Sequence, residues 1–284
     1  MADKLSNIIG QLPTLIASYV SFFALTYLLM KYCKDPKSIR DLPIKTRLSQ
    51  KAQYWTNYVS ILHALIVLIL SVISGLRDGI AFEKDNSNID NMVAGISYGY
   101  FINETMYGFY YDYNDTMTHI HHVLGLLILP YSLIKQRYGN VICWVYIIGE
   151  ISNPFMLLRN NLLKHSGFKF CEFICGVLFC ILFMSMRVFG GAVIGGLIYL
   201  SHVTMFVKMI FALLWFLSLV WSFKVLNLFL KHFAEKNSDN FVGTLYKFVD
   251  GIRKNNNKMI IFFALAATIS FLPPFITFNH EALI

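Results

Sequence analysis

Residues 58–76 read YVSILHALIVLILSVISGL, a stretch of 19 residues without one lysine, arginine, aspartate or glutamate. A helix of about 20 mostly apolar residues can cross the hydrocarbon core of a bilayer. The whole chain shares this character: of its 284 residues, 56% are hydrophobic and 14% are charged, and the mean hydropathy is +0.56. Soluble domains carry about 25% charged residues. The composition therefore excludes an ordinary soluble enzyme, a disordered chain and a collagen, and it predicts a membrane protein.

Seven further apolar runs lie along the chain, and together they predict an all-α, multi-pass transmembrane helix bundle of about eight spans. With 58–76 included, the eight runs are 12–30, 58–76, 92–110, 119–134, 140–157, 170–187, 203–223 and 259–278. The fourth and fifth runs are short and are separated by only a few polar residues. Residues 189–200 either extend the sixth span or form a re-entrant or interfacial piece. Pro273-Pro274 predict a kink near the end of the last span.

The basic residues are concentrated in alternate connecting segments. Of 24 lysines and arginines, 17 fall in 31–57, 111–118, 158–169 and 224–258, which eight spans would place on one side of the membrane. Positive charge favours the cytoplasmic or matrix side. We therefore expect an even number of spans with both termini outside. Because the charges flank apolar runs, the net charge of +8 indicates a membrane and not a nucleic-acid partner.

Ionisable groups inside the apolar runs are the candidate functional residues, because a charge at membrane depth is costly unless it is paired or hydrated. The candidates are Glu104, Asp115, His119, His121, His122, Glu150 with Asn153, and His63 in the second run. Arg187 and Lys208 are interpreted as snorkelling or paired cations. The other histidines are isolated, and the five cysteines have neither metal-ligand spacing nor an even count. We expect no metal, no cofactor and no disulfide framework.

Two chemistries fit these residues. An acidic residue can orient a neutral imidazole, so that the other ring nitrogen acts as a base or nucleophile in acyl transfer. On a helix, Asp115, His119 and His122 share one face. Alternatively, the polar groups fix helix packing or bind a lipid headgroup. The catalytic residues would be His121, His122 and Asp115; the lipid-binding pocket would contain Glu104, His119, His121, His122, Glu150, Asn153 and His63.

Several short motifs occur in a recognisable order. They are Trp55, His63-Ala64-Leu65, Gly99-Tyr100-Phe101-Ile102-Asn103-Glu104, His121-His122, Glu150-Ile151-Ser152-Asn153-Pro154-Phe155 and Arg159. In this order the chain resembles the TLC-domain family over roughly residues 50–230. That family includes the ceramide synthases and a larger branch of TLC-domain-containing proteins. The resemblance therefore divides the chain into an N-terminal helix and basic loop (1–49), a TLC-like domain (50–230), and a polar loop with a last helix (231–284).

In ceramide synthases, the resemblance implies that the histidine pair, here His121 and His122, carries acyl transfer from acyl-CoA to a sphingoid base. This sequence departs from that pattern: Glu104 stands where aspartate is usual, and Glu150 with Asn153 replaces a more acidic segment. The nearer resemblance is to the other branch, which is linked to membrane lipid composition. It implies membrane lipids as partners and the endoplasmic reticulum as the location.

Three functions remain open from the sequence. The chain binds or handles membrane lipids or acyl chains in a polar pocket between helices. Alternatively, it is a non-catalytic subunit of a large membrane assembly with other membrane protein subunits as partners, for example a respiratory complex of the mitochondrial inner membrane. In the third case it is an N-acyltransferase of ceramide-synthase type, with acyl-CoA as co-substrate.

Overall fold

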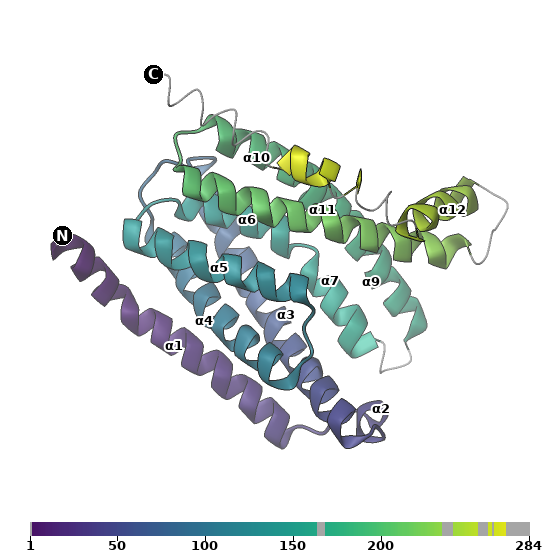
Figure 1. Ribbon diagram of the computed structural model, residues 1–284. Helices are drawn as coiled ribbons and strands as arrows, with labels where there is room; N and C mark the ends of the chain where they lie inside the picture. Colours follow the sequence, from purple (N-terminus) through teal and green to yellow (C-terminus); the bar gives the residue numbers. More distant parts are fainter. Residues whose placement is uncertain (1, 164–167, 235–240, 255–260, 263, 271–284) are drawn as a thin grey trace. The chain divides into compact units, whose positions relative to one another are not determined.

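The computed structural model describes residues 2–163, 168–234, 241–254, 261–262 and 264–270. All regular elements within these ranges are helices, and the chain divides into two compact units, Met1–Gly176 and Val177–Ile284 (Figure 1). Helices are the expected solution, because hydrocarbon offers the backbone no external hydrogen-bond partner. The predicted all-α, multi-pass fold class is confirmed.

The helices follow one another with short connections. In the first unit they are α1 (Ala2–Tyr32), α2 (Lys37–Arg40), α3 (Ile44–Asp78), α4 (Asn88–Tyr111), α5 (Thr116–Lys135), α6 (Gly139–Glu150), α7 (Asn153–Leu158) and the π-helix η1 (Arg159–Leu163). The helix α9 (Lys169–Leu182) begins in the first unit and continues into the second. The second unit adds the π-helix η2 (Phe183–Gly190), α10 (Gly191–Leu200), α11 (Met205–Ala234) and α12 (Phe241–Lys254).

Six helical stretches in the described residues are long and apolar enough to cross a membrane. They are Gly10–Tyr32, Ile44–Asp78, Thr116–Lys135, Gly139–Asn161, Lys169–Leu200 and Met205–Lys231. These stretches contain five of the eight predicted runs, including the short fourth and fifth, and cover all but the first two residues of the run 203–223. Residues 189–200 extend the sixth span. The predicted run 259–278 is helical at 261–262 and 264–270, and its remainder, with Pro273-Pro274, lies outside the described residues.

The remaining predicted run, 92–110, forms α4, which is long enough to span but too polar to be counted with the six. Its 24 residues rise by about 36 Å. The helix packs against α1, α3, α5 and α6, so most of its polar side chains are shielded from lipid. An interior position therefore explains why this helix has the weakest apolar signal.

Two glycines allow α1 to approach α4 closely. A methyl group at Gly99 would lie 2.5 Å from the backbone nitrogen of Tyr19 and 2.8 Å from the carbonyl carbon of Ser18, and one at Gly95 would lie 3.1 Å from the Thr14 methyl group. Glycines four residues apart commonly permit such contact between membrane helices. The Ser18 hydroxyl donates to the carbonyl of Ile96 at 3.0 Å. The first helix thus belongs to the compact core of the first unit.

Loops that the charge pattern assigns to one side of the membrane meet in the first unit. On the basic side, Ser49 donates to the carbonyl of Asp112, and Asn161 donates to that of Tyr54. On the opposite side, the segment after α3 contacts the α5–α6 turn, where Asn86 bonds with Gln136. Loops predicted to share a side of the membrane thus contact one another in this unit, and the membrane topology itself stays a prediction.

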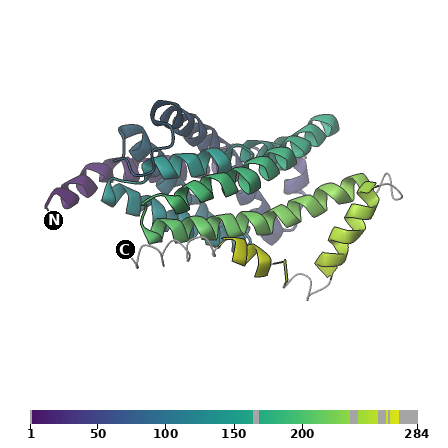
Figure 2. The same ribbon diagram turned by 90° about the horizontal axis from the view of Figure 1, so that it is seen from above.

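In the second unit, α11 packs against η2, α10 and α12. Gly195 faces Phe211, and Arg187 is buried with its guanidinium 5.1 Å from the Phe183 ring centre. Lys208 is also buried, so neither predicted membrane cation simply extends to water. The α12 helix contacts α11 (Figure 2).

Candidate functional site

Polar side chains from four helices gather inside the first unit. The buried members are Ser60 and His63 on α3, Ser97, Tyr100 and Glu104 on α4, His122 on α5, and Tyr146 and Glu150 on α6. Two of the predicted pocket residues in distant parts of the sequence, His63 and His122, are close enough to influence each other electrostatically. The fold therefore places in one group several of the residues that the sequence assigned to a lipid-binding pocket, among them His63, Glu104, His122 and Glu150.

His63 lies flat against Tyr100 in the centre of this group. The two ring planes are nearly parallel, with their centres 3.8 Å apart. His63 Nε2 lies 3.2 Å from Ser97 Oγ, which is within hydrogen-bond distance. The Tyr100 hydroxyl donates to Ser60 Oγ at 2.9 Å. These contacts fix the orientation of both rings and give the centre of the bundle several groups that can donate or accept hydrogen bonds.

Phe101 separates this stack from the predicted histidine pair. Its ring centre lies 5.3 Å from that of His122 and 6.0 Å from that of His121. His122 is buried and His121 is half-buried. The neighbouring Gly125 makes room for Phe101, because a methyl group there would lie 2.5 Å from the phenyl ring. The paired histidines thus contact an aromatic ring inside the first unit.

The buried glutamates have partners other than these imidazoles. Tyr113 donates its phenol to Glu104 Oε1 at 3.0 Å, and Asn153 donates its amide to Glu150 Oε2 at 2.9 Å. Burial raises the pKa of Tyr113 well above the ordinary tyrosine value, so the phenol stays a neutral donor. Tyr100 lies within electrostatic range of both glutamates. The two carboxylates therefore lie near the central ring stack.

Asp115 performs a local structural task. It is the N-cap of α5, and its Oδ1 accepts from the backbone nitrogen of Thr118 at 2.8 Å and from its hydroxyl at 2.7 Å. The His119 ring stacks on Phe109 with centres 4.0 Å apart. Asp115 is therefore not part of the helix face that carries His119 and His122, because it caps the N-terminus of that helix.

Buried polar atoms without a hydrogen bond of normal geometry are concentrated where α4 ends and α5 begins, which we call the α4–α5 corner. In this part of the described chain they are Glu104 Oε2, Thr105 Oγ1, Asn114 Nδ2, His119 Nδ1 and His122 Nδ1. The Asn114 amide and the His119 ring both adjoin Gly108, and Asn114 also approaches the Glu104 carboxylate. Buried polar groups are normally satisfied, so such a cluster is typical of a site for water or a ligand.

Comparison with known proteins gives one match: the sequence model of the TLC domain covers residues 15–234. The chain belongs to the TLC-domain family. No curated protein and no solved structure matches it. It is thus an integral, multi-pass membrane protein of a lipid-related family. The match begins within α1, so this TLC domain includes the helix that packs on α4. The match also starts well before Trp55, the first residue of the sequence motifs. The boundaries at 49 and 230 stay predictions.

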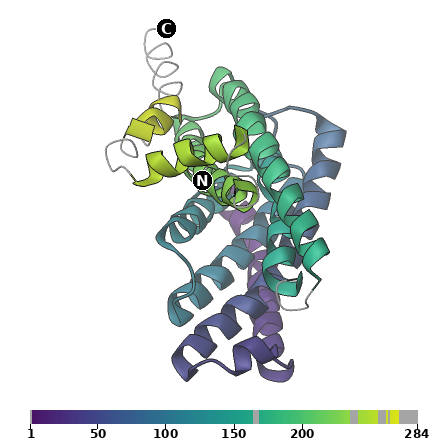
Figure 3. The same ribbon diagram turned by 90° about the vertical axis from the view of Figure 1, so that its right-hand side faces the viewer.

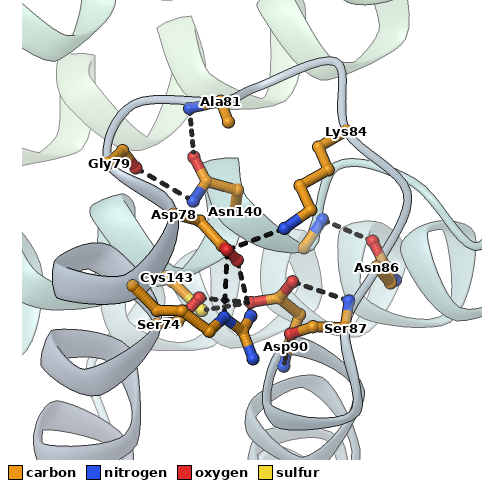
Figure 4. Close-up of polar contacts among 12 residues, drawn as sticks. Ser74, Asp78, Gly79, Ala81, Lys84, Asn86, Ser87, Asp90, Asn140 and Cys143 are labelled. Carbon is orange, nitrogen blue, oxygen red and sulfur yellow. Dashed lines mark hydrogen bonds and ion pairs between the residues drawn. The ribbon is translucent and has the colours of Figure 1, made fainter.

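The opposite end of this TLC domain contains a polar cluster that the sequence motifs did not indicate. The carboxylate of Asp90 accepts from Ser74 Oγ at 2.6 Å, from Cys143 Sγ at 3.4 Å and from the backbone nitrogen of Ser87 at 2.9 Å (Figure 4). Asn140 bridges the loop by bonding the backbone of Gly79 and Ala81. The Ser87-x-x-Asp90 spacing is a capping-box pattern, so one part of this cluster was readable from sequence.

This end cluster connects α3, α4 and α6 through contacts that range from buried, at Asp90, to exposed, between Asp78 and Lys84. Asp78 pairs with Arg77 and Lys84 beside it, and Asn86 accepts from the backbone nitrogen of Gly139 at 2.7 Å (Figure 4). Its polar atoms are largely satisfied within the protein, in contrast to those of the α4–α5 corner. We therefore assign the end cluster to stability.

Proposed function

We propose that this TLC-domain protein binds and handles a membrane lipid, with the lipid's polar head at the α4–α5 corner. The observation that carries the proposal is the concentration of buried, unsatisfied polar atoms at Glu104, Thr105, Asn114, His119 and His122. Each such atom costs free energy unless something else completes its hydrogen bonds. A bound headgroup would supply those bonds.

The chemistry of the corner favours a head that both donates and accepts hydrogen bonds. The Asn114 amide nitrogen is a donor, a carboxylate oxygen of Glu104 is an acceptor, and the Thr105 hydroxyl can do either. A hydroxyl or amide group meets all three requirements. A phosphate would meet the Glu104 carboxylate, and the two like charges would repel.

The position of the corner suits a lipid lying along the protein. Glu104 is seven residues before the end of α4, about 10 Å along the helix axis, which is close to the polar layer of a bilayer. On α5, the apolar side chains of Ile120, Val123 and Leu127 are exposed at helical spacing and face the surrounding hydrocarbon. A lipid whose head reached the corner could lay its chain along this face.

The experiment is photocrosslinking of the purified, nanodisc-embedded protein with a long-chain alcohol that carries a diazirine in its chain. We expect peptides of α4 and α5 to be labelled, and His119→Phe to lower that labelling severalfold, because phenylalanine keeps the stacking on Phe109 and removes the ring nitrogens. His202→Phe, an exposed histidine outside the site, is the matched control. Equal labelling of the wild type and both variants would count against the proposal.

A second candidate function is acyl transfer, favoured by the buried His122 Nδ1, which has no hydrogen-bond partner. In that reaction His122 would take the proton from an amine or hydroxyl, which attacks the thioester carbonyl of acyl-CoA and expels the CoA thiolate. Incubation with acyl-CoA and a sphingoid base tests it. Product that disappears in folded His122→Ala supports the reaction, and no product from the wild type argues against it.

The scaffold interpretation makes a different prediction. If the chain is a non-catalytic subunit of a larger membrane assembly, the α4–α5 corner takes no lipid head, and the His119→Phe and His202→Phe variants label alike. The endoplasmic reticulum and the mitochondrial inner membrane both stay predictions of location.

A further inference from the structure

A second surface of the first unit carries exposed positive charge. It consists of residues 31–48, which comprise the end of α1, the short α2 and the first turns of α3, and which we call the basic end. Figures 1 and 3 show these segments together at one end of the unit. Its cations without an ion pair to any described residue are Lys31, whose ammonium lies over the Tyr27 and Tyr32 rings, and Lys34, Lys37, Arg40, Lys45 and Arg47.

Of the two acidic residues in this segment, Asp35 and Asp41, Asp35 has its own partners in the first unit. Asp35 accepts from Trp55 Nε1 at 2.9 Å and pairs with Lys51 at 3.3 Å. The side chain of Ile39 is only 2% exposed, so α2 is anchored against the bundle. The cations without an ion pair are therefore presented by a folded segment, and they outnumber the one other carboxylate of the basic end, the exposed Asp41.

Apolar side chains are interleaved with these cations. Tyr32, Ile44 and Leu48 are 70%, 68% and 46% exposed. Exposed apolar groups beside lysine and arginine are typical of protein surfaces that lie in the headgroup layer, where the apolar groups enter the lipid and the cations meet phosphate. The segment begins where the first apolar run ends at residue 30, so phospholipid heads are its immediate neighbours.

We propose that the basic end binds the anionic phospholipid heads of the surrounding leaflet. Charge complementarity selects anionic over zwitterionic lipid, because clusters of basic residues next to a membrane helix gain attraction from each negative headgroup that they contact. This surface is separate from the α4–α5 corner, so the inference goes beyond the proposed function and stands without it. A ring of bound anionic lipid would fix how deeply the first unit lies in the bilayer.

The experiment compares spin-labelled phosphatidylserine with spin-labelled phosphatidylcholine at the surface of the full chain in phosphatidylcholine nanodiscs. We expect the wild type to restrict phosphatidylserine preferentially, and the preference to fall by about twofold or more in Lys37→Gln/Arg40→Gln. The matched control is Lys135→Gln/Arg137→Gln, which removes two charges from the other end of the unit. Thermal denaturation verifies that both variants are folded.

Salt provides a second measurement, since a headgroup contact at an exposed surface is screened within about 8–10 Å at physiological ionic strength. The preference of the wild type should weaken as salt is added. A wild type that restricts both lipids equally, or equal losses in the two double variants, would overturn the proposal. So would an unchanged lipid preference accompanied by loss of a co-purifying acidic protein from Lys37→Gln/Arg40→Gln, which would identify a protein partner instead.

Discussion

Single residues in this protein show how a buried carboxylate is stabilised by the hydrogen bonds that it accepts. Asp90 is 1% exposed and accepts from a hydroxyl, a thiol and a backbone nitrogen on three segments (Figure 4). Glu104 has one phenolic donor and a second oxygen without a normal hydrogen bond. The same chemical group therefore accepts several hydrogen bonds at one end of the first unit and has an oxygen without a normal hydrogen bond at the other.

Replacing Asp90 by asparagine should destabilise the protein by about 1–3 kcal/mol, because an amide nitrogen would face donors that now meet a carboxylate oxygen. The melting temperature in detergent, followed by circular dichroism, measures the effect. Asp85→Asn is the matched control, since that side chain is 87% exposed and its contact with Arg137 is long, at 3.7 Å. Equal melting temperatures for the two variants would contradict the assignment of Asp90 to the end cluster.

At the scale of elements, α4 is the organising helix of the first unit. Polar residues on it would be costly against lipid, but they meet α1, α3, α5 and α6 instead. Close approach by α1 depends on Gly95 and Gly99, and Asn103 farther along α4 donates to Thr26 at 3.2 Å. The first helix thus covers a face of α4 that could not be left in hydrocarbon.

Gly99→Ala tests this packing with the smallest possible side chain. The new methyl group would overlap backbone atoms of Ser18 and Tyr19, so α1 must move away, at a cost of about 1–3 kcal/mol. Gly196→Ala on α10 is the control, because a methyl group there meets open space and alanine favours helix over glycine. We expect a lower melting temperature for Gly99→Ala alone. A drop of the same size in Gly196→Ala would point to a general effect of the substitution.

At the scale of the whole molecule, the concentration of lysines and arginines in alternate connecting segments predicts how the chain crosses the membrane. The basic end and the α4–α5 loop share one side of the first unit, as the contact of Ser49 with Asp112 shows. The acidic segment after α3 shares the other side with the α5–α6 turn. Positive charge on the first side predicts that it faces the cytoplasm or matrix.

Thiol labelling checks this orientation. In a Cys171→Ser background, a membrane-impermeant maleimide should react with the exposed Cys33 from the cytoplasmic or matrix side only. A cysteine introduced by Asp85→Cys should react from the opposite side only. Labelling of both positions from one side would show that α3 does not cross the membrane and would contradict the topology.

The sequence by itself determined that most of the chain lies in a lipid bilayer and that its secondary structure is helical. Apolar runs of spanning length predict helices in lipid, because only internal backbone hydrogen bonds are possible there, and the family motifs around His121-His122 and Glu150 were visible in the chain. Tertiary structure alone decided which polar atoms meet. Tyr113 rather than a histidine binds Glu104, and His63 stacks on Tyr100. Such pairs depend on the rotation and depth of helices distant in sequence, which packing at residues such as Gly99 and Gly125 sets and hydropathy does not encode.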